Sequence, residues 1–204
     1  MNDVRNMVFA IGRQFASGGR ELGYELAKKL EIPYYDGDLI SHAAEQSGLH
    51  PEAVERFDEK SPECIWHSYW FDTFPIISES LGQKTSNAQF DFIRSVAKKG
   101  GAVIVGRCAD YILRDHKNLV SIFFHAPMEC RIARFLKEHP EMESKVNSVI
   151  TRADKTRAQY YSFYTGKTWG ASESYDLSLR TDLHSDDFLV DMIISFAKAK
   201  LGDL

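Results

Sequence analysis

The segment best suited to chemistry lies directly after the first apolar run of the chain. Residues 8–11 (VFAI) predict a buried strand, and a glycine-rich turn and a helical pattern over residues 20–30 follow. The turn holds these polar and small residues: Ser17, Gly18, Gly19, Arg20 and Glu21. Glycines let backbone N–H groups converge on an anion, the following helix N-terminus adds to the same field, and Arg20 adds a forked donor. We therefore predict that residues 12–21, called the phosphate loop below, bind phosphate.

The phosphate loop departs from the G-x-x-x-x-G-K-[ST] pattern of nucleotide-binding loops. With Gly19 taken as the second glycine, Gln14 stands at the first glycine, Arg20 at the lysine and Glu21 at the hydroxyl residue. Two interpretations stay open from this segment alone. It is either a phosphate site or a tight turn whose glycines serve packing.

Further polar residues follow other apolar stretches. Arg107 and Asp110 come just after residues 102–105 (AVIV), and Asp36 ends a short stretch containing two tyrosines. Because parallel strands end at one edge of a sheet, these residues are expected near the phosphate loop. There Arg107 could hold an acceptor phosphate, and Asp110 could orient the acceptor or read a base. Asp36 could accept a hydrogen bond from the acceptor or hold a magnesium-bound water. The alternatives are a surface Arg–Asp pair and, for Asp36 with Asp38, capping of a helix.

A cluster of basic residues lies on a polar helical segment later in the chain. Arg152, Lys155 and Arg157 precede two glycines, Gly166 and Gly170, that end the helical pattern. A mobile lid at residues 145–170 would bring these charges to a transferring phosphoryl group and exclude water. The alternative is an ordinary solvated helix face.

The elements that must position these residues follow from the hydrophobic pattern. Strands are predicted at residues 8–11, 33–35, 102–105 and 119–124, and helices at 20–30, 87–99, from 127 onward, 146–161 and 186–200. The last helix carries an apolar stripe of Leu189, Met192, Ile193 and Phe196. Two more helices are predicted after Asp38 and near Pro51. Strands that alternate with helices predict an α/β fold with a mostly parallel sheet covered on both faces.

One stretch, residues 61–82, is dense in aromatic residues but has poor periodicity, so it is left unassigned. Its Trp66, Trp70 and Phe74 either line a base pocket or form a satellite hydrophobic cluster, and the second interpretation is favoured.

The composition excludes several classes of protein. A net charge of -4, from 25 basic and 29 acidic residues, gives no field that would favour nucleic acid or a membrane surface. The three cysteines are widely spaced and the histidines show no metal-ligand spacing, so neither a disulfide framework nor a structural metal site is predicted. The polar N-terminus leads into an apolar run too short for a signal peptide. We expect one cytoplasmic domain over residues 1–204.

The chain resembles the cytidylate kinase-like family over nearly its whole length. The resemblance rests on these segments: residues 11–21 (IGRQFASGGRE), 33–36 (PYYD), 105–113 (VGRCADYIL), 126–134 (APMECRIAR), 154–157 (DKTR) and 160–161 (YY). The family's own loop tends to read S-G-G-R-E, so the departure from the usual loop pattern belongs to the family. The resemblance implies a P-loop fold with an acceptor-binding subregion at about residues 50–90 and a lid at about 145–170.

The resemblance also implies roles for individual residues. Arg157 aligns with a lid arginine, and Arg131 and Arg134 lie on a helix that borders the adenine of ATP in related kinases, although ordinary surface arginines are the favoured alternative. The resemblance also favours a role for Asp36 in the acceptor site over helix capping. Arg20 and Arg157 are then the predicted catalytic residues.

The sequence thus predicts phosphoryl transfer from ATP, with Mg2+, to a small acceptor, and a nucleoside monophosphate such as CMP is the acceptor implied by the resemblance. Two alternatives remain. The missing lysine and hydroxyl fit a nucleotide-sensing module with reduced catalysis, and the same scaffold also supports kinases for non-nucleotide acceptors. A homodimer is left open.

Overall fold

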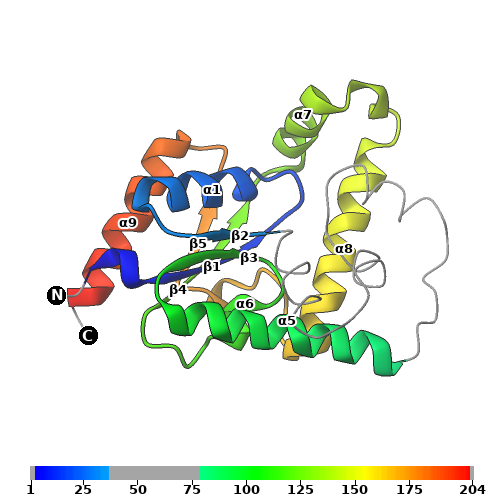
Figure 1. The fold of residues 1–204 in the computed structure, drawn as a ribbon. Coiled ribbons are helices and arrows are strands. Elements are labelled where there is room, and N and C mark those ends of the chain that lie inside the picture. Colours follow the sequence, from blue (N-terminus) through cyan, green and yellow to red (C-terminus); the bar gives the residue numbers. More distant parts are fainter. Residues whose placement is uncertain (1–2, 37–78, 203–204) are drawn as a thin grey trace.

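The computed structural model describes residues 3–36 and 79–202. Within this part, five parallel strands form one sheet: β1 (Val8–Arg13), β2 (Tyr34–Tyr35), β3 (Ala102–Val105), β4 (Leu119–His125) and β5 (Leu177–Arg180). Their spatial order is β2-β3-β1-β4-β5, so β1 is central and pairs with β3 on one side and β4 on the other (Figure 1). All the pairings are parallel, which confirms the predicted α/β fold.

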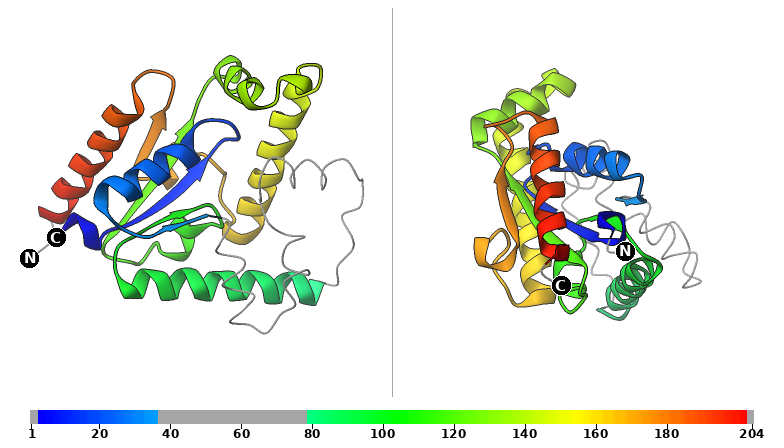
Figure 2. Two further views of the ribbon diagram at one scale, coloured as in Figure 1. Left: turned by 45° about the horizontal axis from the view of Figure 1, so that its top comes forward. Right: turned by 90° about the vertical axis from the view of Figure 1, so that its left-hand side faces the viewer.

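The helices of this part cover both faces of the sheet and also lie beyond the carboxyl ends of its strands. Their bounds are α1 (Gly19–Leu30), α5 (Glu79–Lys99), α6 (Ala109–Ile112), α7 (Met128–Glu138), α8 (Val146–Thr165) and α9 (Asp186–Gly202). Short 3-10 turns occupy Val4–Asn6, Pro140–Met142 and Ser172–Ser174. Helices α1 and α9 lie on one face, and α5 and α6 lie on the other (Figures 1 and 2). Helices α7 and α8 stand beyond the carboxyl ends of the strands (Figure 1).

The two faces of β1 explain why its sequence is continuously apolar. Successive side chains of a strand point to opposite faces. Phe9 and Ile11 are therefore buried against α1 and α9, whereas Val8 and Ala10 are buried against α5 and α6. A strand covered on both sides needs apolar residues at every position, and this requirement makes β1 recognisable in the sequence.

Strand β5 was not predicted. Only alternate residues of β5 are shielded, since Leu177 and Leu179 pack on the core while Ser178 and Arg180 are exposed. Four residues with this pattern carry too weak a signal to separate a strand from a loop. The strand exists because β4 offers it a free parallel edge.

The other predicted elements are confirmed with shifted ends. Helix α5 begins at Glu79 instead of residue 87, and α8 continues to Thr165, where Gly166 caps it in a left-handed conformation (φ 68°). In α9, Leu189 and Ile193 are buried, whereas Met192 and Phe196 are only partly buried. The buried face also includes these residues: Val190, Ile194, Ala197 and Leu201.

Several predictions lie outside the described residues. They are the helices after Asp38 and near Pro51, the aromatic residues Trp66, Trp70 and Phe74, and most of the acceptor-binding subregion at residues 50–90.

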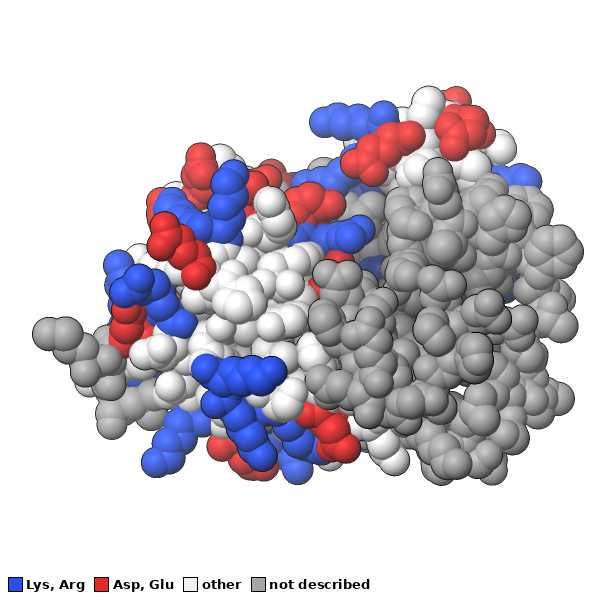
Figure 3. Space-filling view, viewed as in Figure 1, with Lys and Arg blue, Asp and Glu red and all other residues white. Residues whose placement is uncertain are grey.

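Charge is mixed on the described part of one face of the molecule. On the face shown in Figure 3, basic and acidic side chains are interspersed. None of the helices within residues 3–36 and 79–202 combines the length and the apolar composition needed to cross a bilayer.

Candidate active site

The phosphate loop leads from the end of β1 into α1 and leaves the first amides of the helix pointing out of its N-terminus. Gly18 is the N-cap residue and has a left-handed conformation, with φ 84°. The first backbone bond of the helix is donated by the Leu22 N–H to the Gly18 carbonyl oxygen, at 3.0 Å. The N–H groups of Gly19, Arg20 and Glu21 therefore precede the helical hydrogen-bond ladder. Such groups, together with the helix dipole, favour an anion.

Close packing restricts position 19 to glycine, and the left-handed conformation favours glycine at position 18. A Cβ on Gly19 would lie 2.8 Å from Arg13 Cβ and 2.9 Å from Phe124 Cβ, because α1 starts directly over β1 and β4. A Cβ on Gly18 would lie 3.0 Å from the guanidinium carbon of Arg134. Gly19 thus has a packing role, and this role is compatible with an anion site at the same helix end.

Arg20 and Asp36, predicted for separate roles, form an ion pair. Arg20 Nε lies 2.6 Å from Asp36 Oδ2, and Asp36 Oδ1 lies 3.8 Å from Arg13 Nη2. Burial lowers the pKa of the Arg20 guanidinium, but Asp36, Tyr34 and Glu21 together outweigh this and leave that pKa above its ordinary value. The Asp36 carboxylate thus lies between two arginines at the end of β2. Any ligand of Arg20 must compete with it.

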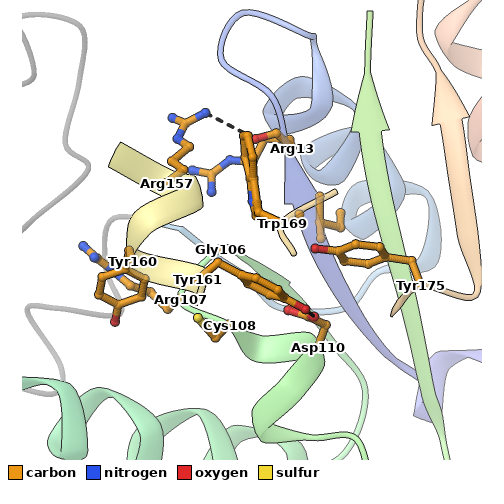
Figure 4. A pocket seen from close by; sticks show the side chains of 12 residues that line it. Arg13, Gly106, Arg107, Cys108, Asp110, Arg157, Tyr160, Tyr161, Trp169 and Tyr175 are labelled. Carbon is orange, nitrogen blue, oxygen red and sulfur yellow. Dashed lines mark hydrogen bonds between the residues drawn. The ribbon is translucent and has the colours of Figure 1, made fainter. Parts of the chain in front are cut away.

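A cleft opens beside the phosphate loop at the carboxyl ends of β1 and β3 (Figure 4). It encloses about 360 Å³ of space open to solvent, and its walls come from the ends of β1 and β3, from α8 and from residues 169–175. The lining residues are Ile11, Gly12, Arg13, Gly106, Arg107, Cys108, Asp110, Arg157, Tyr160, Tyr161, Trp169 and Tyr175.

Three arginines from distant parts of the sequence line this cleft (Figure 4). Arg13 ends β1 and is only 7% exposed. Arg157 of α8 donates from Nη1 to the Arg13 carbonyl oxygen at 3.4 Å, and Arg107 lies with its guanidinium carbon 5.7 Å from the centre of the Tyr160 ring. Guanidinium forks placed in this way suit an anionic, bidentate ligand such as a phosphate.

The backbone that presents Arg107 is strained. Gly106, Arg107 and Cys108 have successive φ angles of 86°, 53° and 55°, all left-handed. For a residue with a Cβ this conformation costs roughly 1–2 kcal/mol. Strained residues that persist in a fold cluster at functional sites.

The opposite wall of the cleft is a carboxylate surrounded by aromatic rings. Asp110 Oδ2 accepts a hydrogen bond from the Tyr161 hydroxyl at 2.7 Å (Figure 4). Burial raises the pKa of Asp110, and the hydrogen bond from Tyr161 only partly offsets this. Burial also raises the pKa values of Tyr161 and Tyr175, so both hydroxyls stay protonated and can donate. This wall can bind the polar, uncharged part of a ligand.

Only one of the three predicted lid cations reaches the cleft. Arg157 lines it, whereas Arg152 and Lys155 lie on the exposed side of α8. The solvated-face interpretation therefore describes Arg152 and Lys155 in this conformation.

The structure gives Arg131 a position different from the predicted adenine contact. Its side chain is 6% exposed and forms an ion pair with Asp154, while its Nη1 also donates to the Phe15 carbonyl oxygen at 3.3 Å. A guanidinium buried in this way has no free face for stacking on a base. Arg134 lies at the loop surface and donates from Nη1 to the Ala16 carbonyl oxygen at 3.0 Å.

Four of the residues that the structure brings to the site had no individual role in the sequence prediction. Arg13 directly follows the predicted first strand and its glycine, so its place at the sheet edge could have been inferred. Trp169 lies between two glycines beyond the helical pattern, and its ring packs edge-on against Phe123 at 5.2 Å. The remaining two are Tyr175 in the cleft and Asp154 behind the loop.

Comparisons with known proteins bear on the family and the fold. The model of the cytidylate kinase-like family matches residues 8–183. An uncharacterized protein from Eubacterium ventriosum ATCC 27560 has a crystal structure that superposes with a TM-score of 0.73 at 28% identity, covering 95% of this chain and 99% of that one. Comparison with curated proteins gave no match.

Two more distant structures share the fold. The shikimate kinase from Acinetobacter baumannii, in complex with shikimate, has a TM-score of 0.52 at 11% identity and covers 94% of this chain and 92% of its own. The shikimate kinase from Bacteroides thetaiotaomicron also has a TM-score of 0.52, at 15% identity, covering 96% and 99%.

Proposed function

The chain belongs to the cytidylate kinase-like family, and from this premise we propose that it transfers the terminal phosphoryl group of ATP to a nucleoside monophosphate such as CMP. Kinase-type chemistry on a P-loop fold follows from the family and the fold. The nature of the acceptor is our proposal. The observation that carries it is that Arg13, Arg107 and Arg157 all line one cleft next to the N-terminus of α1.

The proposed donor site is the phosphate loop. The N–H groups of Gly19, Arg20 and Glu21 would bind the ATP phosphates, and Arg20 would add its charge by exchanging Asp36 for a phosphate oxygen. Because the exchange swaps one charged partner for another, it would not leave the guanidinium unpaired.

The proposed acceptor site is the cleft. Arg107 and Arg13 would hold the monophosphate, and Asp110 with its tyrosine partner would face the rest of the nucleotide. Arg157, which reaches the same cleft from α8, would neutralise charge that develops on the transferred group. In-line transfer between two bound substrates needs no covalent intermediate.

Mg2+ bound with ATP would neutralise negative charge on the phosphates. Such an ion is held largely by the nucleotide and by water. The carboxylate of Asp36 already lies between Arg13 and Arg20, and Glu21 stands where a hydroxyl residue is usual, so we assign neither residue to the metal.

A coupled assay of ADP release tests this function across the nucleoside monophosphates, with shikimate as a non-nucleotide comparison. We expect turnover with at least one pyrimidine monophosphate. If ATP binds in calorimetry and no monophosphate is phosphorylated, the acceptor assignment is wrong.

The second candidate is a nucleotide-binding sensor with reduced catalysis. The loop lacks both the lysine and the hydroxyl of the usual pattern, which favours this function. A sensor would bind ATP without turnover, and Arg157→Ala would leave its affinity for ATP unchanged. A kinase would lose turnover in the same variant.

A further inference from the structure

Phe15, in the middle of the phosphate loop, is inserted into the hydrophobic core of the α7–α8 unit. Its side chain is 8% exposed, and its ring lies 5.6 Å from that of Phe135. The other buried members of this cluster come from α7, α8 and the turn between them: Phe135, Met142, Val146, Ile150 and Ala153. The loop is therefore packed against the lid region as well as against the sheet.

Polar contacts fix the backbone of the same residue. Asp154 Oδ1 accepts a hydrogen bond from the Phe15 N–H at 2.7 Å, and Arg131 donates to the Phe15 carbonyl oxygen at 3.3 Å. Arg131 and Asp154 also pair with each other. We call this set of contacts the Phe15 clamp. It joins α7, α8 and the phosphate loop through one residue.

The clamp is shielded from water, which makes it stiff. The side chain of Arg131 is 6% exposed and that of Asp154 is 17% exposed. Removing one partner of a shielded ion pair leaves the other charge uncompensated, so the pair resists opening far more than a surface pair does.

Asp154 and Arg157 are three residues apart on α8, so both lie towards the same side of the helix. Asp154 contacts the loop, while the guanidinium carbon of Arg157 lies 5.4 Å from the centre of the Phe15 ring. A shift of α8 that moves Arg157 in the cleft must therefore pull on the backbone of Phe15 as well.

We propose that Asp154 is a positioning residue that ties the phosphate loop to α8, so that nucleotide binding at the loop and acceptor binding in the cleft strengthen each other. This inference rests on the proposed function for the identity of the two ligands. The clamp itself is a property of the protein alone. Coupling between two sites requires an element that both ligands bias, and α8 with its clamp is that element.

The first test is free of ligands. Amide hydrogen exchange at Phe15 is compared in the wild type, Asp154→Ala and Asp154→Asn. Loss of the acceptor in the alanine variant should speed exchange at Phe15 by about tenfold or more. Asparagine keeps an oxygen acceptor and should restore much of the protection. Unchanged exchange in the alanine variant would overturn the clamp.

The matched control is Asp191→Ala. Asp191 also forms an ion pair between two elements, with Lys29 of α1 at 2.7 Å, but its side chain is 62% exposed and remote from the loop. This variant should leave the Phe15 amide as protected as in the wild type. Equal acceleration in both variants would mean general loosening of the fold and would contradict a specific clamp.

The second test measures the coupling by titrating a non-hydrolysable ATP analogue with and without CMP. In the wild type, CMP should increase the affinity for the ATP analogue by about fivefold or more. In Asp154→Ala this factor should fall close to one, while Asp191→Ala keeps it. If coupling persists in Asp154→Ala, the positioning role is refuted. If the wild type binds the analogue but not CMP, the proposed acceptor fails, and the exchange experiment still decides the clamp.

Discussion

Gly19→Ala is the substitution whose effect follows most directly from the structure. The new Cβ would lie 2.8 Å from Arg13 Cβ and 2.9 Å from Phe124 Cβ. Both neighbours are Cβ atoms fixed to the backbone of β1 and β4, so they cannot turn away as the end of a side chain could. Overpacking of this kind costs about 1–3 kcal/mol. Alanine regains at most about 1 kcal/mol through its better helix propensity, so the clash prevails.

The expected result is a loss of stability together with a loss of nucleotide affinity. A net cost of about 1–2 kcal/mol lowers the melting temperature of a chain of this size by roughly 2–8 °C. The same clash pushes the first turn of α1 away from the phosphate loop, so binding of a non-hydrolysable ATP analogue should weaken by about tenfold. Scanning fluorimetry and calorimetric titration measure the two effects.

Gly23→Ala, one turn further along α1, is the matched control. Its Cβ would lie 2.9 Å from Ile11 Cδ1, the movable end of a flexible side chain. This variant should be neutral or more stable by up to about 1 kcal/mol, with unchanged affinity. If Gly19→Ala melts and binds like Gly23→Ala, the reasoning about the helix start is refuted.

Burial raises the pKa of Asp110, so its ionised form is a cost of the folded state at neutral pH. Asp110→Asn should therefore melt above the wild type at pH 7.5, and the gap should close as the pH falls towards 3.8; a gap that widens on acidification contradicts this. Arg157→Ala should lower kcat by about 10²- to 10³-fold in the coupled assay, whereas Arg152→Ala, on the exposed side of α8, should stay within about twofold. Tyr161→Phe removes the hydroxyl that donates to Asp110 and should cost about 1–3 kcal/mol in chemical denaturation; an unchanged midpoint would show that the bond contributes nothing.

Most of the helices and strands were predictable, because their hydrophobic pattern in the sequence matches the faces that they bury in the fold. Strands β1, β3 and β4 are buried on both faces and therefore read as continuous apolar runs. Helix α1 shows its buried face in the spacing of Leu22, Leu26 and Leu30. Strand β5 lacks such a signal, because its pairing depends on the edge of β4 and only alternate residues are shielded.

The sequence also indicated which segments would meet at the site. The positions of the phosphate loop and of Arg107 with Asp110 follow from the order of strands, and that of Arg157 follows from the segments shared with the family. Parallel strands bring their carboxyl ends to one edge, so such residues gather there whatever lies between them in the chain.

What the sequence could not determine is which partner each charged side chain takes. Arg20 pairs with Asp36 across the end of β2, and Arg131 turns inward to Asp154 instead of outward to a base. In both pairs the partners are distant in sequence, and the pairing depends on helix rotation and on the depth of burial. The residue type alone determines the sign of each charge. Which oppositely charged side chain it pairs with is decided only by the tertiary packing.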